Sequence, residues 1–329
     1  YVERCFKSGA MDFDDLLLKT NELLNRFPDV LAKYQDRFRY ILVDEYQDTS
    51  GTQNKLVELL VNYWDEPNLF VVGDDDQSIY AWRGAVNAMQ QLPLPESRLT
   101  TSFRFGEEIA LHANAILGAL NETVPLMGNP LLNSKVVNKP HTKMRDAILC
   151  RTNARAMELL LSGLVHGDKV SLQADHVKLN RFVDAAAMLK QGKRVTDVPE
   201  LAWFNSWHDV HEYCETNDGS DIKPLVKLVD DHGTDPLKKA LAKITPIEQA
   251  DYIISTAHKA KGLEWNRVHI EDDYQFKVND KDHKISDEEL RLLYVACTRA
   301  KVSLNIHHIY DLMQQLKKQM PSSLRKVVG

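Results

Sequence analysis

Two adjacent carboxylates, Asp44 and Glu45, directly follow the short apolar run at residues 40–43. Such a run predicts a buried strand, which would deliver both carboxylates to one edge of a sheet. In nucleotide hydrolysis, one carboxylate at such an edge holds Mg²⁺, usually through water, and the next can activate the attacking water. A solvated acidic turn is the alternative, and for an isolated Asp-Glu pair it is the commoner case.

A second polar string follows the next predicted strand, at residues 69–72. Within it, Gln77 could hydrogen-bond a phosphate or the water shell of a metal ion. Tyr80 and Trp82 offer ring faces on which a nucleobase can stack, an interaction worth about 1–3 kcal/mol per base. The alternative is that both aromatic side chains belong to the core. Both polar clusters follow predicted strand ends, where parallel sheets bind their ligands.

The elements that position these residues alternate between strand and helix. Strands are predicted at residues 40–43, 69–72, 147–150, 253–255, 268–270 and 303–307, and helices at 12–34, 51–64, 107–120, 153–165 and 285–300. This alternation predicts an α/β fold with a parallel sheet. Residues 166–246 are richer in charge and in turn signals, and we expect them to form a small inserted helical module.

Composition limits the class of protein. The chain has 329 residues, enough for two domains, and its 43% apolar and 27% charged residues are typical of a soluble globular protein. The net charge of −6 argues against a passive coat on DNA, so any nucleic-acid binding must use a local track. The four cysteines lack metal-ligand spacing and no long apolar run occurs. We therefore expect an intracellular protein with no membrane partner, from the cytoplasm of a bacterium or phage-infected cell, or from a nucleus.

Five segments, in order along the chain, resemble motifs of the UvrD/Rep-type superfamily 1 DNA helicases. They are residues 44–48 (motif II), 73–85 (motif III), 99–105 (motif IV), 255–265 (motif V) and 288–300 (motif VI). Motif IV departs from the family pattern, because Ser102 and Phe103 stand where asparagine and tyrosine are usual before the arginine. The residues of motifs IV and V most resemble those of the F-box DNA helicase branch, although the sequence contains no F-box.

The resemblance implies two RecA-like parallel-sheet domains. Residues 1–95 would form the first, incomplete domain, residues 96–165 and 247–329 the second, and residues 166–246 an inserted accessory module. The implied activity is that of an ATP-dependent 3′–5′ DNA helicase or translocase in repair or recombination. Its partners would be ATP, Mg²⁺, single-stranded DNA and junctions of single- and double-stranded DNA.

The resemblance also implies a role for individual residues. The catalytic group would be Glu45 as base, Gln77 as sensor of the γ-phosphate, and Arg104 and Arg299 as arginine fingers. Asp44 would hold the metal with Glu45, and Glu264 would contact the nucleotide sugar. The DNA track would comprise Tyr80, Trp82, Thr256 and His258. The alternatives are that Arg299 caps a helix, that Arg104 serves a salt bridge and that His258 is a surface or packing residue.

The family's phosphate-binding loop, Gly-x4-Gly-Lys-Ser/Thr, does not occur among the 329 residues. The nearest candidate, residues 163–169, has the wrong spacing. We therefore expect the C-terminal portion of a helicase, whose loop lies in a missing segment or another chain and which alone binds ATP weakly without hydrolysing it. The competing hypothesis is a non-catalytic DNA-binding or regulatory subunit. Retention of Asp44, Glu45, Arg104 and Arg299 favours the motor, because a binding module has no chemical use for them.

Overall fold

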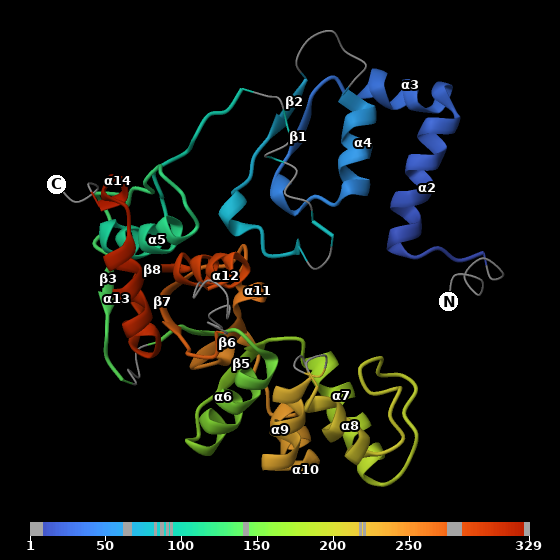
Figure 1. Cartoon of the computed structure of the whole chain (residues 1–329), viewed down its shortest axis with the longest axis vertical. Helices are drawn as coiled ribbons and strands as arrows, with labels where there is room; N and C mark the ends of the chain where they lie inside the picture. Colours follow the sequence, from blue (N-terminus) through green and yellow to red (C-terminus); the bar gives the residue numbers. More distant parts are fainter. Residues whose placement is uncertain are drawn as a thin grey trace. The chain divides into compact units, whose positions relative to one another are not determined.

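The computed structural model of the chain shows two compact units, Tyr1–Arg98 and Leu99–Gly329 (Figure 1). It describes residues 9–61, 68–81, 84–85, 89, 92, 95–140, 145–216, 219, 222–274 and 285–325. Both units contain parallel β-structure with helices, which confirms the predicted α/β fold. In the part of the chain described, no helix combines the length and the apolar character needed to cross a membrane.

The first unit is built around a parallel pair of short strands. Its elements are α2 (Phe13–Arg26), α3 (Pro28–Arg37), β1 (Ile41–Val43), η1 (Tyr46–Asp48), α4 (Gly51–Val61), β2 (Leu69–Val71) and η2 (Asp75–Gln77). The prediction of a single helix at residues 12–34 is wrong, because the helix is interrupted at Phe27 and two helices, α2 and α3, form instead. Phe27, with φ of −125° and ψ of 85°, leaves the helical region before Pro28, the residue that opens α3, because the proline ring disfavours helical geometry in the residue before it.

The β1–β2 sheet carries an uncovered apolar surface. Leu42 and Phe70 are register partners, so they lie on the same face, and they are 73% and 62% exposed. A two-stranded sheet buries little surface by itself. The described part of the first unit therefore presents apolar side chains on this face.

The second unit contains a six-stranded parallel sheet in the order β3-β8-β7-β4-β6-β5. The strands are β3 (Lys135–Val137), β4 (Ala147–Cys150), β5 (Val170–Gln173), β6 (Tyr252–Thr256), β7 (Trp265–Ile270) and β8 (Ala300–Asn305). All four residues of the central strand β4 are buried. A continuous apolar run is what a strand covered on both faces requires, and this one was predicted from sequence.

Helices surround the sheet of the second unit (Figure 1). They are α5 (Glu107–Ala119), α6 (Asn153–Val165), α7 (His176–Lys190), α8 (Trp207–Cys214), α9 (Lys223–His232), α10 (Thr234–Leu241), α11 (Ala257–Ala260), α12 (Asp287–Cys297), α13 (Tyr310–Gln319) and α14 (Ser322–Arg325). The 3₁₀ turns in the described part of this unit are η6 (Ile247–Gln249) and η7 (His307–Ile309), and η7 follows β8.

The stretch predicted as an inserted module, residues 166–246, is not separate from the sheet. It begins with β5, which pairs with β6 at the sheet edge, and α7 to α10 share one apolar core with α6 and β5. A four-residue strand flanked by charged residues gives too few positions for a periodic signal, which is why the sequence did not reveal it. The functional division into domains stays a prediction.

Candidate active site

In the first unit, the predicted acid pair lies at the carboxyl end of β1. Glu45 adopts the left-handed conformation, with φ of +52°, and its backbone N–H donates to Asp44 Oδ1 at 2.9 Å. That conformation costs a non-glycine residue about 1–2 kcal/mol, so the turn must be held by its surroundings. The turn leaves both carboxylates exposed at the strand end, where a hydrated cation could reach them.

A buried glutamine joins the two polar clusters. Gln47 is fully buried, and its Nε2 donates to Glu45 Oε2 at 2.5 Å while its Oε1 accepts from the Asp74 N–H at 3.1 Å. Gln77 Nε2 in turn donates to Asp74 Oδ2 at 2.7 Å. Glu45 and Gln77 are thus connected through Gln47 and Asp74. Sequence reasoning assigned no role to Gln47, because a polar residue between Tyr46 and Asp48 gives no sign of burial.

Gly73 allows the two segments to approach each other. A Cβ atom at this position would lie 2.2 Å from Gln47 Oε1 and 2.4 Å from Met89 Sδ. A side chain at position 73 would therefore force the ends of Gln47 and Met89 to move. Beyond it, Tyr80 is half-buried, so its ring face can be reached only in part, and Trp82 lies outside the described residues. Their roles in DNA stacking stay predictions.

In the second unit, Arg104 and Glu264 meet although 160 residues separate them. Arg104 Nε donates to Glu264 Oε2 at 2.8 Å, and Arg104 Nη1 donates to the carbonyl of Thr298 at 3.2 Å. Lys301 Nζ donates to Glu264 Oε1 at 3.1 Å. The hydrogen bonds from Arg104 and from Lys301 lower the pKa of Glu264. Motifs IV, V and VI therefore converge on one charged cluster, and the predicted salt-bridge alternative for Arg104 is present in this conformation.

Arg299 is buried, with only 2% of its surface exposed. Its Nε donates to the carbonyl of Val295 at 2.9 Å, Nη2 to Thr298 Oγ1 at 3.0 Å and Nη1 to the carbonyl of Leu263 at 3.4 Å. The side chain thus ties the last turn of α12 to the loop before β7, which is the capping alternative weighed from the sequence. In this conformation its guanidinium cannot contact a bound phosphate, so an arginine-finger role requires the side chain to rotate outward.

Thr256 and His258 lie at the carboxyl end of β6. Thr256 is 5% exposed and caps α11, because its Oγ1 accepts from the Lys259 N–H at 3.4 Å. His258 is half-buried in the short helix that follows. The capping role of Thr256 is structural, and contacts of either residue with DNA stay predictions.

A further carboxylate that sequence reasoning missed, Asp273, lies in the loop after β7. Asp273 accepts from the backbone N–H groups of Arg151 and Thr152 and from Thr152 Oγ1, each at 2.8 Å. Burial raises the pKa of Asp273, although these hydrogen bonds oppose the shift. Asp273 thereby joins the end of β4 to the loop after β7. The sequence analysis assigned no role to the acidic run at residues 271–273.

Two family models match this chain. Residues 1–92 match the UvrD/REP helicase N-terminal domain, and residues 251–307 match the UvrD-like helicase C-terminal domain. The chain thus contains two domains of the UvrD/Rep-type superfamily 1 helicase family. This confirms the family predicted from the motifs. The matched ranges contain every predicted site residue except Arg104.

Individual helicases of known name are also similar to part of this chain. The ATP-dependent DNA helicase PcrA of Leuconostoc citreum is 44% identical over 131 residues, and PcrA of Staphylococcus epidermidis is 44% identical over 124 residues. PcrA of Staphylococcus aureus is 43% identical over 124 residues. Each match covers 38% of this chain and only 17% of the curated relative. The narrower likeness to the F-box DNA helicase branch stays a prediction.

Proposed function

We propose that this UvrD/Rep-family chain supplies nucleotide- and DNA-contacting parts of an ATP-dependent 3′–5′ DNA helicase or translocase in repair or recombination. The observation that carries the proposal is the hydrogen-bonded path from Glu45 through Gln47 and Asp74 to Gln77. A motor must connect the group that senses the γ-phosphate to the group that activates water. Such a path, which runs through the buried Gln47, would transmit a displacement of Gln77 to Glu45, because each link is a directional contact.

The donor set at the end of β1 suits Mg²⁺. Asp44 and Glu45 offer exposed carboxylate oxygens, and Mg²⁺ prefers oxygen ligands while keeping several of its waters. When bound, the ion would neutralise charge on the phosphates. Asp44 would orient the hydrated ion and Glu45 would accept a proton from the attacking water. Arg104 and Glu264 would then contact the phosphate and sugar of the nucleotide.

Hydrolysis also needs a phosphate-binding loop, which the 329 residues do not contain. We propose that the loop comes from a further segment or another chain, which would also cover the exposed face around Leu42 and Phe70. The chain alone should then bind ATP weakly and show no turnover. A steady-state ATPase assay with single-stranded DNA tests this, with Glu45→Gln as background control. Turnover by the parent chain that Glu45→Gln abolishes would overturn the proposal of inactivity.

DNA binding by the full chain provides an independent test. We expect Tyr80→Ala to weaken binding of a fluorescent oligo-dT by about 5- to 150-fold, the equivalent of one lost stacking contact. The control is Trp203→Ala, because Trp203 is 88% exposed and lies outside both family-matched ranges. Equal anisotropy titrations for the parent and Tyr80→Ala chains would remove Tyr80 from the DNA track.

The buried position of Arg299 favours a second candidate, a DNA-binding or regulatory subunit that no longer hydrolyses ATP. The two candidates differ in how nucleotide binding depends on Mg²⁺. A motor part requires Mg²⁺-dependent binding of a fluorescent ATP analogue that Asp44→Asn abolishes. Binding that is absent, or indifferent to both Mg²⁺ and Asp44→Asn, would support the regulatory subunit.

A further inference from the structure

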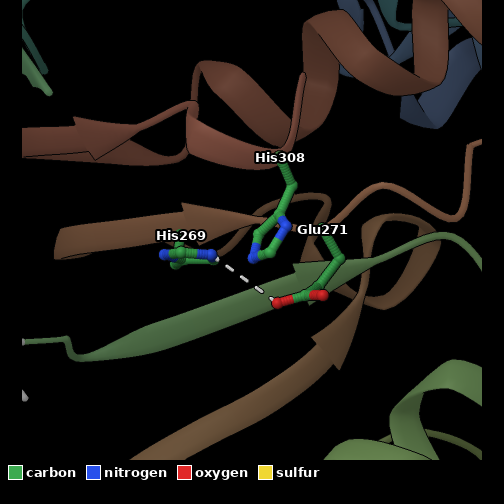
Figure 2. A group of neighbouring side chains, drawn as sticks. All are labelled: His269, Glu271 and His308. Carbon is green, nitrogen blue, oxygen red and sulfur yellow. Dashed lines mark ion pairs between the residues drawn. The ribbon is translucent and has the colours of Figure 1, made fainter. Parts of the chain in front are cut away.

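A compact group of metal-ligating side chains lies in the second unit, and none of its three members is a predicted nucleotide- or DNA-contacting residue. His269, Glu271 and His308 each offer one ligand atom, and these atoms lie within 4.8 Å of one another. His269 Nε2 is 3.6 Å from Glu271 Oε1. Figure 2 shows the His308 ring directed toward the space between the His269 ring and the Glu271 carboxylate.

The sheet topology creates this group. His269 is in β7 and Glu271 follows it by two residues, a spacing that places extended residues on the same side. β8 lies beside β7 in parallel, and His269 is the register partner of Asn305. The turn η7 begins at His307, one residue beyond the end of β8, and brings His308 close to His269 and Glu271.

Two of the three side chains in this group are buried. His269 and Glu271 are each 3% exposed, whereas His308 is half-buried. Two imidazoles and a carboxylate concentrated away from water form a strong electron-donor set, because little solvent competes for their lone pairs. The half-buried His308 leaves one side on which an ion can enter and a water can complete the coordination.

Neighbouring charges orient Glu271 without neutralising the whole cluster. Arg155 holds Glu271 Oε2 at 2.8 Å, so Oε1 is the oxygen on the side of His269. The same guanidinium is shared with Glu158 at 2.9 Å and lies 3.9 Å from Asp272. Three carboxylates thus share one arginine, which leaves negative charge for a cation. An outer partner that fixes a ligating carboxylate is a common feature of protein metal sites.

We propose that His269, Glu271 and His308 bind one divalent transition-metal ion, with Zn²⁺ preferred over Mg²⁺. Two imidazole nitrogens and one carboxylate oxygen are a ligand set that Zn²⁺ uses together with a water, whereas Mg²⁺ requires oxygen ligands. Tetrahedral ligands at Zn²⁺ lie about 3.3 Å apart. Closure from the observed spacing requires side-chain movements of about 1 Å, which rotation of the half-buried His308 can provide.

The ion would fasten η7, and the helix α13 that follows it, to the end of β7. α13 packs against α5, so the bond would stabilise the C-terminal side of the second unit. This role is independent of ATP binding, because none of the three residues belongs to the predicted nucleotide or DNA site. Zn²⁺ binding by these residues can therefore be measured whether or not the proposed helicase function is correct.

Zn²⁺ binding to the metal-free full chain can be measured by competition with a chromophoric chelator. We expect one site that His308→Gln weakens at least tenfold. The matched control is His307→Gln, because His307 is the adjacent histidine and its Nδ1 instead contacts Asn138 Oδ1 at 2.7 Å. Glu271→Gln serves as the second variant, and circular dichroism identifies any variant that loses its fold.

Thermal unfolding gives a second readout that surface binding of Zn²⁺ would not mimic. Added Zn²⁺ should raise the Tm of the parent and of His307→Gln, should raise it less in His308→Gln, and Mg²⁺ should have no comparable effect. The proposal is overturned if folded His308→Gln and His307→Gln bind Zn²⁺ equally tightly and show equal shifts in Tm. It is also overturned if the metal-free parent chain shows no site.

Discussion

The stability of the second unit should fall in mild acid because of one buried histidine, His112. This residue of α5 is 7% exposed, and its Nδ1 lies 2.7 Å from the carbonyl oxygen of Glu108, to which the ring N–H can donate. Burial lowers the pKa of His112 from 6.5 to about 4, the Glu108 carbonyl opposes the shift, and Lys317 of α13 adds to it. The imidazole is therefore neutral in the folded chain at neutral pH.

The sign and size of the effect follow from proton linkage. Between pH 6.5 and about 4, the unfolded chain binds a proton at His112 that the folded chain does not bind. The free energy of unfolding therefore rises with pH in this window, and the contribution is complete above 6.5 and lost as pH falls toward 4. A shift of this size corresponds to about 3 kcal/mol in total, and to about 2 kcal/mol between pH 7 and pH 5.

Urea unfolding of the full chain at pH 7 and pH 5, followed by circular dichroism, measures how the free energy of unfolding changes with pH. Replacement by glutamine removes the titrating group, so His112→Gln should lose about 2 kcal/mol of the parent's pH dependence. The control is His208→Gln, because the His208 side chain is 79% exposed. The other titrating side chains contribute equally to the pH dependence of the parent and of both variants. The reasoning is refuted if His112→Gln and the parent lose the same free energy between the two pH values.

Three further predictions concern the candidate active site. Gly73→Ala should destabilise the first unit by about 1–3 kcal/mol, because its Cβ would collide with the buried amide of Gln47. Gly51→Ala, with open space around the added atom, should not, and equal urea midpoints for the two variants would contradict the packing argument. Glu264→Gln should cost under about 1 kcal/mol at pH 7, since the carboxylate is 43% exposed. Because the pKa of Glu264 is lowered from 4.5, this difference from the parent should vanish as the pH falls below that value, and a constant difference would exclude the ion pairs as its cause. Arg299→Ala should destabilise the second unit by about 3 kcal/mol through loss of its buried hydrogen bonds, whereas an unchanged Tm would show that the guanidinium is normally exposed.

The local chemistry of the site could be predicted because it depends on neighbours in the sequence. An apolar run followed by Asp44 and Glu45 places carboxylates at a strand end wherever the strand lies, and the structure has β1 in that position. The buried run of β4 was predicted on the same ground and is confirmed. The apolar runs of β1 and β2 were also predicted to be buried strands, and this was wrong for Leu42 and Phe70, because the two-stranded sheet leaves both side chains exposed. The order of motifs II to VI identified the family, which the family models confirm.

Tertiary structure alone decided which distant residues meet. Gln47 links Glu45 to Asp74 only because β1 and β2 pair, and Arg299 turns inward because carbonyls of α12 and of the loop before β7 lie within its reach. His308 joins His269 because β8 lies beside β7, 39 positions away in sequence. Periodicity in a sequence reports which side of an element is buried, but it does not encode the order of strands in a sheet. Contacts between strand ends are therefore determined only when the whole sheet has formed.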